Sequence, residues 1–253
     1  MKTLDILFSI LAVFAITATL FAQDYSMSLE GITKVVISAE TTIVVKQHDK
    51  ATFLIPESEN YRDTTTKRKE GLKSVFSKGE NNTNYGVEVK KEGSSLVVKG
   101  LRERRESNLV VYLPKTMNIS IESLANNEIY IDGFSSEIEA INHQGATVLA
   151  NISGPIVTEN SNGNITVYFY ELSQLSPSSI VAENGDIEIR LPANVNANVT
   201  SKTPRGEFFT DFDLIKDNSN LRNSRRLQGL LNDGGVEIDL QNLKGDIYLI
   251  KIK

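Results

Sequence analysis

Apolar and polar residues alternate in short runs along most of the chain, which is the pattern of β-strands with one buried face. The clearest example is a phrase that occurs twice, as NGNITV over residues 162–167 and as NGDIEI over residues 184–189. Each copy is a tight-turn signal followed by alternating apolar residues, and the second begins 22 residues after the first. Looser copies cover residues 144–149, 205–209, 235–240 and 245–250. A turn-then-strand unit that recurs about every 20 residues is typical of a repeat architecture.

The repeat predicts an all-β solenoid of short strands with about 20 residues per rung. Turn glycines Gly163, Gly185 and Gly206 are expected one full turn apart, and Asn or Gly at the corners would supply the positive φ that tight turns need. Inward side chains of successive rungs should stack on one another. One such stack is expected to contain, in order, Ile165 and Val167, then Ile187 and Ile189, then Phe208.

Two polar segments interrupt the strands. Residues 57–84 are charged and polar, and they are predicted to form a surface insertion. Residues 216–232 are also irregular and are predicted to form a second loop. Residues 236–240 and 246–252 follow as two final strands that close the fold. The mature chain, residues 23–253, is therefore expected to be a single β-solenoid domain.

The first 22 residues have the layout of a secretory signal peptide. Lys2 precedes an apolar run over residues 6–21, and the small residue Ala22 precedes the polar Gln23. An uncleaved membrane anchor is the alternative, but the run is shorter than the ~20 residues that span a bilayer comfortably. We therefore expect secretion across the inner membrane to the periplasm, the cell surface or the extracellular space, with no stable membrane anchor after cleavage.

Composition and charge exclude several functional classes. The chain has no cysteine, so it is not a disulfide scaffold and must be stabilised by burial and backbone pairing. Its formal net charge is -5 with both signs mixed, which argues against nucleic-acid binding. No serine lies in a nucleophile elbow and no glycine-rich loop leads into a helix, so hydrolase and nucleotide-binding motifs are missing. No cofactor is expected.

Few titratable residues group in a way that suggests catalysis or metal binding. His48 and His143 lie far apart in the sequence, so a metal site built on imidazole is not indicated. Asp186 and Glu188 share a strand face, as do the paired acids of enzymes that cleave glycans. The acidic cluster over residues 211–217 lacks the ordered spacing of a calcium loop. We interpret these acids as solvated surface residues, and no catalytic or metal site is predicted.

Two basic clusters could bind an anionic ligand. The cluster over residues 102–106 is interrupted by two glutamates, which favours a charge-balanced loop. Arg222, Arg225 and Arg226 have no acid among them, and they are the better candidate for contact with an anionic ligand.

Several phrases resemble those of a bacterial family of secreted β-strand-repeat proteins that are usually labelled putative adhesins. The phrases that match, in order, are residues 108–115, 191–199, 205–207, 211–212, 234–238 and 244–248. The resemblance implies a right-handed β-helix similar to adhesin heads. It implies no agreed biochemical activity and no catalytic residues, and the two polar insertions depart from the usual pattern.

These observations favour a secreted or envelope-associated, non-enzymatic β-solenoid that serves as an adhesin-like scaffold or binding protein. A carbohydrate-active enzyme on the same fold, a lyase or a hydrolase, is one alternative. A purely structural envelope protein is the other. A cell-surface glycan and another envelope protein are the partners considered, and open terminal rungs would also permit self-association.

Overall fold

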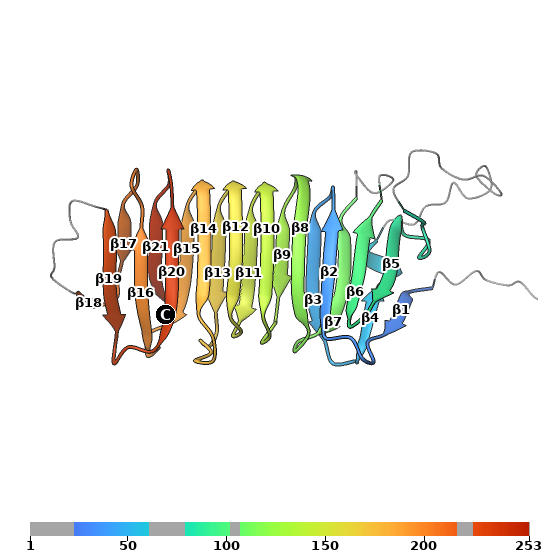
Figure 1. Ribbon diagram of the computed structural model, residues 1–253, viewed down its shortest axis with the longest axis horizontal. Helices are drawn as coiled ribbons and strands as arrows, with labels where there is room; N and C mark the ends of the chain where they lie inside the picture. Colours follow the sequence, from blue (N-terminus) through green and yellow to red (C-terminus); the bar gives the residue numbers. More distant parts are fainter. Residues whose placement is uncertain (1–22, 61–78, 102–106, 217–224, 253) are drawn as a thin grey trace, which may run out of the picture.

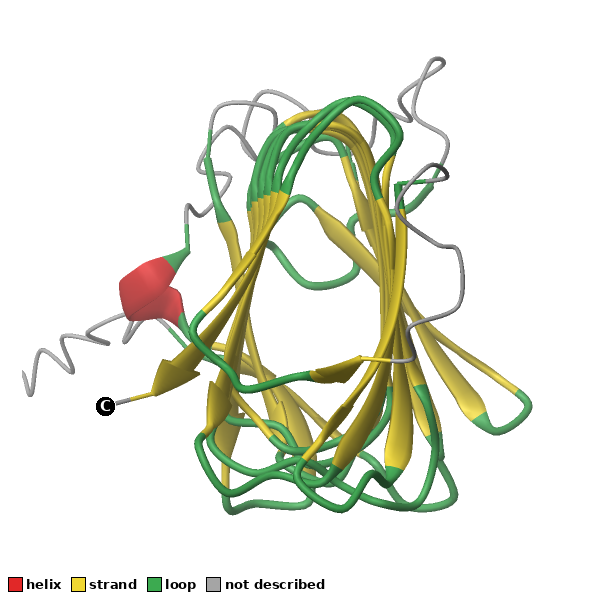
Figure 2. Cartoon of the chain, turned by 90° about the vertical axis from the view of Figure 1, so that its left-hand side faces the viewer, coloured by secondary structure: helices red, strands yellow, loops and turns green. Residues whose placement is uncertain are grey.

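The computed structural model describes residues 23–60, 79–101, 107–216 and 225–252. They form two long β-sheets that lie face to face and enclose the core (Figures 1 and 2). The single helix in these ranges is the 3-10 helix η1 (Glu57–Glu59), so no described helix could cross a membrane. The all-β, solenoid-like architecture is therefore confirmed. The predicted signal peptide lies outside the described residues.

Each sheet is a single row of hydrogen-bonded strands. In spatial order, sheet A has ten strands: β1 (Tyr25–Ser28), β4 (Thr52–Ile55), β7 (Leu109–Pro114), β3 (Ile43–His48), β9 (Ile129–Asp132), β11 (Thr147–Ile152), β13 (Ile165–Phe169), β15 (Ile187–Pro192), β21 (Ile247–Ile252) and β17 (Phe208–Thr210). Sheet B has eleven: β18 (Ile215–Lys216), β19 (Arg226–Leu231), β16 (Ala197–Lys202), β20 (Val236–Asn242), β14 (Ser178–Asn184), β12 (Ile156–Asn162), β10 (Ile138–Gln144), β8 (Asn118–Asn126), β2 (Lys34–Ala39), β6 (Ser95–Gly100) and β5 (Val87–Glu92).

Each central rung contributes one strand to each sheet, and equivalent apolar residues lie side by side. In sheet A, Ile165 of β13 lies beside Ile187 of β15, as the repeat predicts. In sheet B, Ile138 of β10 lies beside Ile156 of β12. All four side chains are fully buried, and burial of each contributes about 1.5–3 kcal/mol to folding. The alternation read from the sequence thus builds two continuous apolar columns that meet in the core.

The last two strands of the chain do not close the solenoid. Strand β20 lies between β14 and β16, and β21 lies between β15 and β17 (Figure 1). Phe208 therefore lies beside Ile247 instead of Ile187, so the predicted stack is wrong at its last step. The physical reason is that the segment 193–196 carries the chain past one rung position, which β20 and β21 fill later. Strands β2 and β3 are likewise placed between later strands at the other end.

Antiparallel strands close sheet B at both ends and sheet A at the β1 end, whereas sheet A ends at β17, which pairs with β21 in parallel. Strand β5 pairs with β6 and β1 with β4 at one end, while β19 pairs with β16 and β18 with β19 at the other. The loop predicted over residues 216–232 is therefore wrong for β19. Only Gly229 and Leu231 of that strand are buried, which left its sequence without a clear apolar alternation. Short edge strands of this kind limit edge-to-edge pairing with other chains.

Turn glycines form a column along one edge of the molecule. Gly145, Gly163 and Gly185 have φ between 120° and 130°, the region that favours glycine. The predicted reason for asparagine at the same corners is wrong, because those asparagines have no positive φ. Asn164 instead accepts a hydrogen bond through Oδ1 from the backbone N–H of Asp186 in the next rung, at 2.9 Å.

Buried asparagines tie the rungs together from inside the turns. Asn160 is fully buried, and its Nδ2 donates to the carbonyl of Gly145 at 3.0 Å and to that of Asn164 at 3.4 Å. Asn142 and Asn242 make the equivalent pair of bonds in their own rungs. Each amide therefore bonds a carbonyl of its own turn and one of the neighbouring rung.

Replacing Asn160 by alanine should lower the free energy of unfolding by about 1–3 kcal/mol. The substitution takes the Nδ2 donor away from the carbonyls of Gly145 and Asn164. It also leaves the hydroxyl of Thr147, which donates to Asn160 Oδ1 at 2.8 Å, without that acceptor. Urea unfolding of the purified protein measures the change. Asn194→Ala, at an exposed position, is the matched control, and equal midpoints for the two variants would show that the buried amide adds no stability.

Candidate functional site

The basic residues selected from the sequence lie at the end of the solenoid beside β17. Arg225 donates from Nη1 to the carbonyl of Gly206 at 2.7 Å, and it forms an ion pair with Glu207. Arg226 is exposed at the start of β19, and both arginines line one shallow hollow of about 390 Å³. Arg222 lies outside the described residues. Because Glu207 also lines the hollow, the positive charge of Arg225 is already matched there.

Three of the carboxylates selected from the sequence have hydrogen-bond partners, and Asp217 lies outside the described residues. Asp186 accepts a hydrogen bond through Oδ1 from the backbone N–H of Asp246 at 2.9 Å. This bond links the turns of two neighbouring rungs. Glu188 accepts from Nε of Arg190 at 2.6 Å. Asp211 accepts from the backbone N–H of Lys251 at 2.8 Å. Within the described ranges, no three histidine, aspartate or glutamate residues lie close enough to hold a metal ion.

The two histidines lie on different sheets. His48 Nε2 is 2.7 Å from the carbonyl oxygen of Thr52 in sheet A. His143 Nε2 is 3.3 Å from Oε1 of Glu122 in sheet B. The structure therefore does not bring them together.

A concave surface lies where the chain passes over the skipped rung position. Two hollows, of about 860 Å³ and 450 Å³, flank the segment 193–196 and share Tyr170 and Pro192 in their linings. We call this continuous surface the crossover groove. Its walls come from the ends of β13, β15 and β21 and from the loops that follow β13 and β15. The order of the rungs therefore creates the groove.

Aromatic and basic side chains line the larger hollow. Tyr168 and Tyr170 lie on the outward face on either side of the fully buried Phe169, and they are 37% and 55% exposed. Arg190 lies beside Tyr168 in the sheet, with its guanidinium 5.4 Å from the ring centroid. Lys251 also contributes to this lining, which contains no carboxylate, but its Nζ lies 5.3 Å from the ring centroid of Phe212, outside the hollow. The larger hollow thus presents two rings and the guanidinium of Arg190.

Arg190 is held in one orientation. Its Nε–H donates to Glu188, and this hydrogen bond raises the pKa of the guanidinium above its ordinary value. The ring of Tyr168 lies against the guanidinium as a cation–π contact. The described residues supply no hydrogen-bond partner for the terminal nitrogens of Arg190. The guanidinium is therefore fixed and charged, with donors left for a ligand.

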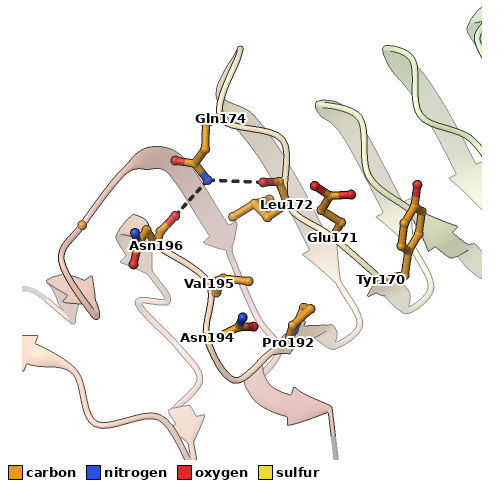
Figure 3. A pocket seen from close by; sticks show the side chains of 9 residues that line it. Tyr170, Glu171, Leu172, Gln174, Pro192, Asn194, Val195 and Asn196 are labelled. Carbon is orange, nitrogen blue, oxygen red and sulfur yellow. Dashed lines mark hydrogen bonds between the residues drawn. The ribbon is translucent and has the colours of Figure 1, made fainter.

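Polar groups line the smaller hollow (Figure 3). Gln174 donates from Nε2 to the carbonyls of Asn196 at 3.1 Å and Leu172 at 3.3 Å, and its Oε1 accepts from the backbone N–H of Val236 at 3.0 Å. These bonds tie the loop after β13 to the crossover segment and to the start of β20. Glu171 is the single carboxylate in this lining.

Inspection of the sequence missed the crossover groove, although part of its signal is present there. Tyr168 and Tyr170 alternate with a buried residue, as outward residues of a strand do. Arg190 follows Tyr168 by the same 22 residues that separate the two NG phrases, so the repeat places them side by side. Lys251 could not be found in this way, because β21 reaches the groove by the change in rung order.

Comparison with known proteins identifies one family. The Toastrack DUF4097 family profile matches residues 123–250. A putative cell adhesion protein from Clostridium sporogenes aligns with 7% identity and a TM-score of 0.43, over 91% of this chain and 99% of that one. A putative adhesin from Bacteroides fragilis aligns with 11% identity and a TM-score of 0.32, over 91% and 96%. No match was found among curated proteins.

Proposed function

The chain belongs to the Toastrack DUF4097 family, and from this membership we propose that it is a non-enzymatic, adhesin-like binding protein of the bacterial envelope. The matched segment, residues 123–250, contains the strands that build most of the crossover groove. The apolar leader over residues 6–21 supports secretion, and with it a place in the periplasm, at the cell surface or outside the cell.

The crossover groove is the observation that carries this proposal. It is concave, and it combines exposed rings with a few fixed polar and charged groups, as preformed ligand sites do. Tyr168 and Arg190 stand on β13 and β15, which are bonded on both sides within sheet A. A ligand would therefore meet a surface that needs little ordering, which reduces the entropy lost on binding.

The lining of the groove supports binding over catalysis. Hydrolysis of a glycosidic bond ordinarily uses two carboxyl groups about 5–10 Å apart. Glu171 is the single carboxylate among the residues that line the two hollows. Asp186 and Glu188, the pair that the sequence suggested, are engaged by Asp246 and Arg190. A carbohydrate-active enzyme is therefore kept as the alternative that the experiment must test.

Purified protein comprising residues 23–253 should bind glycans or whole cells without changing them. The protein would be tested on a glycan array and on bacterial and host cells, with heat-unfolded protein as the control. The same glycans would be incubated with it and assayed for new reducing ends and for unsaturated sugars. We expect saturable binding and no products, because the groove offers contacts without an acid pair.

Two results would contradict this proposal. Release of reducing ends or unsaturated sugars would identify a hydrolase or a lyase on the same fold. Failure to bind any glycan or cell would favour a purely structural envelope protein.

A further inference from the structure

We propose that the crossover groove binds a polymer of uronic acids, with sugar rings stacked on Tyr168 and Tyr170 and a carboxylate held by Arg190. This inference rests on the proposed binding function and specifies its ligand class. It follows from the exposed rings of Tyr168 and Tyr170, from the charge of Arg190 and from the length of the crossover groove.

The two tyrosines form a platform for sugar rings. Tyr168 lies on β13 and Tyr170 at the bend that follows it, and both line the larger hollow. Both are substantially exposed although tyrosine rings provide large apolar surfaces. A pyranose has one flat face of C–H groups that can cover such a ring, while its hydroxyls remain available to water and to neighbouring polar groups.

The guanidinium of Arg190 favours a sugar ring that carries a carboxylate. Arg190 is oriented by Glu188 and Tyr168, and its side chain remains 40% exposed. A planar guanidinium with two unused terminal nitrogens matches the two oxygens of a carboxylate. Glu188 pairs with Nε of Arg190 and leaves the terminal nitrogens to a ligand, and no carboxylate lines the hollow itself. A carboxylate can bind both terminal nitrogens at once, whereas a neutral glycan offers them only single hydroxyl acceptors.

The extent of the groove favours a chain over a single sugar. The two hollows meet at Tyr170 and Pro192, which line both of them. The lining of the smaller hollow mixes polar residues with Leu172 and Val195 (Figure 3). Asn194 and Asn196 of the crossover segment are exposed in that second hollow and can bond sugar hydroxyls. One ring at Tyr168 and the next rings along the smaller hollow would therefore fill the whole surface.

Other polyanions fit less well. One available guanidinium and a net charge of -5 are insufficient for a nucleic acid, whose affinity depends on many phosphate contacts. An acidic peptide would ordinarily bind by adding a strand to a sheet edge. Strands β13, β15 and β21 are internal to sheet A, so the groove offers no such edge.

Calorimetric titration with polygalacturonate tests the proposal directly. Polygalacturonate whose carboxyl groups have been reduced to alcohols is the matched ligand, since it keeps the rings and loses the charge. We expect the unreduced polymer to bind with an affinity that falls as salt rises, and the reduced polymer to bind at least about tenfold more weakly.

Three single variants locate the site. Arg190→Gln should weaken binding of polygalacturonate about tenfold, because it removes a charged donor pair. Tyr170→Ala, at the bend after β13, should weaken it about fivefold through loss of stacking. Arg226→Gln makes the same charge change at the basic cluster of sheet B and should leave the affinity unchanged. Equal melting temperatures confirm that each variant is folded.

The possible outcomes separate the two proposals. Unchanged affinity in Arg190→Gln and Tyr170→Ala, or equal affinity for the reduced polymer, overturns the groove assignment. A loss in Arg226→Gln instead assigns the anion to the basic cluster over residues 225–226. Binding to array glycans or cells without binding to polygalacturonate overturns this inference and leaves the proposed function standing. Binding to none of these ligands contradicts both.

Discussion

Replacement of Gly163 by alanine is expected to lower the free energy of unfolding by about 4 kcal/mol or more. An added Cβ would lie 2.1 Å from the backbone carbonyl oxygen of Gly145, which belongs to the rung below and cannot rotate away. The φ of Gly163, 130°, is also strained for any other residue. Gly185 packs against Gly163 in the same way, so a shift at one turn would disturb the next. Urea unfolding followed by circular dichroism measures the loss.

Gly93→Ala provides the matched control for backbone strain. Gly93 also has a positive φ, 61°, but an added Cβ there would have no atom within 4 Å. Its substitution should cost about 1–2 kcal/mol, the ordinary cost of a left-handed residue. Equal losses for the two alanine variants would show that close packing between the turns adds nothing to stability.

Deletion of residues 236–253 is expected to unfold the segment from residue 193 to residue 235. The deletion removes β20 and β21, and with them the parallel partners that hold β16 and β17 in place. It also removes the fully buried side chains of Ile238, Leu240, Ile247 and Leu249. At about 1.5–3 kcal/mol each, these amount to ~6–12 kcal/mol, which is comparable to the whole stability of a domain.

Limited proteolysis with mass spectrometry tests this expectation. New cleavage sites should appear between residues 193 and 235, while the rungs from β8 to β13 remain protected. Adding residues 236–252 as a separate peptide should restore protection. Continued protection without the peptide would mean that β16 and β17 had moved directly onto β14 and β15. Such a shift would place Ser201 beside Ile180 and Thr210 beside Ile189, and these contacts would bury less apolar surface.

Much of the central fold could be predicted from the sequence because parallel rungs repeat their own local pattern. Turn glycines and alternating apolar residues located β13 and β15 and placed Ile165 beside Ile187. The order of the rungs could not be predicted in the same way. The phrases that begin at Gly206 and at Gly245 both fit beside the phrase at Gly185, and local pattern does not decide between them.

The candidate site was harder to predict from the sequence because it depends on the order of the rungs. Residues that face one another across a parallel sheet can be paired by the repeat, which links Tyr168 with Arg190. The concavity itself arises where the crossover segment passes over the end of β21, and Lys251 enters its lining by the same route. Charge density in the sequence instead indicated Arg225 and Arg226, where Glu207 already offsets one of the charges.

The insertion of β21 between β15 and β17 also determines how the protein would respond to mechanical tension. A pull applied beyond Ile252 enters the fold through a strand that is bonded on both sides, to six residues of β15 and three of β17. Because both pairings are parallel, the strand must slide against two neighbours at once. It cannot peel from an edge one bond at a time, as the last strand of a sequentially wound solenoid would. Force applied there would meet shear resistance within the sheet.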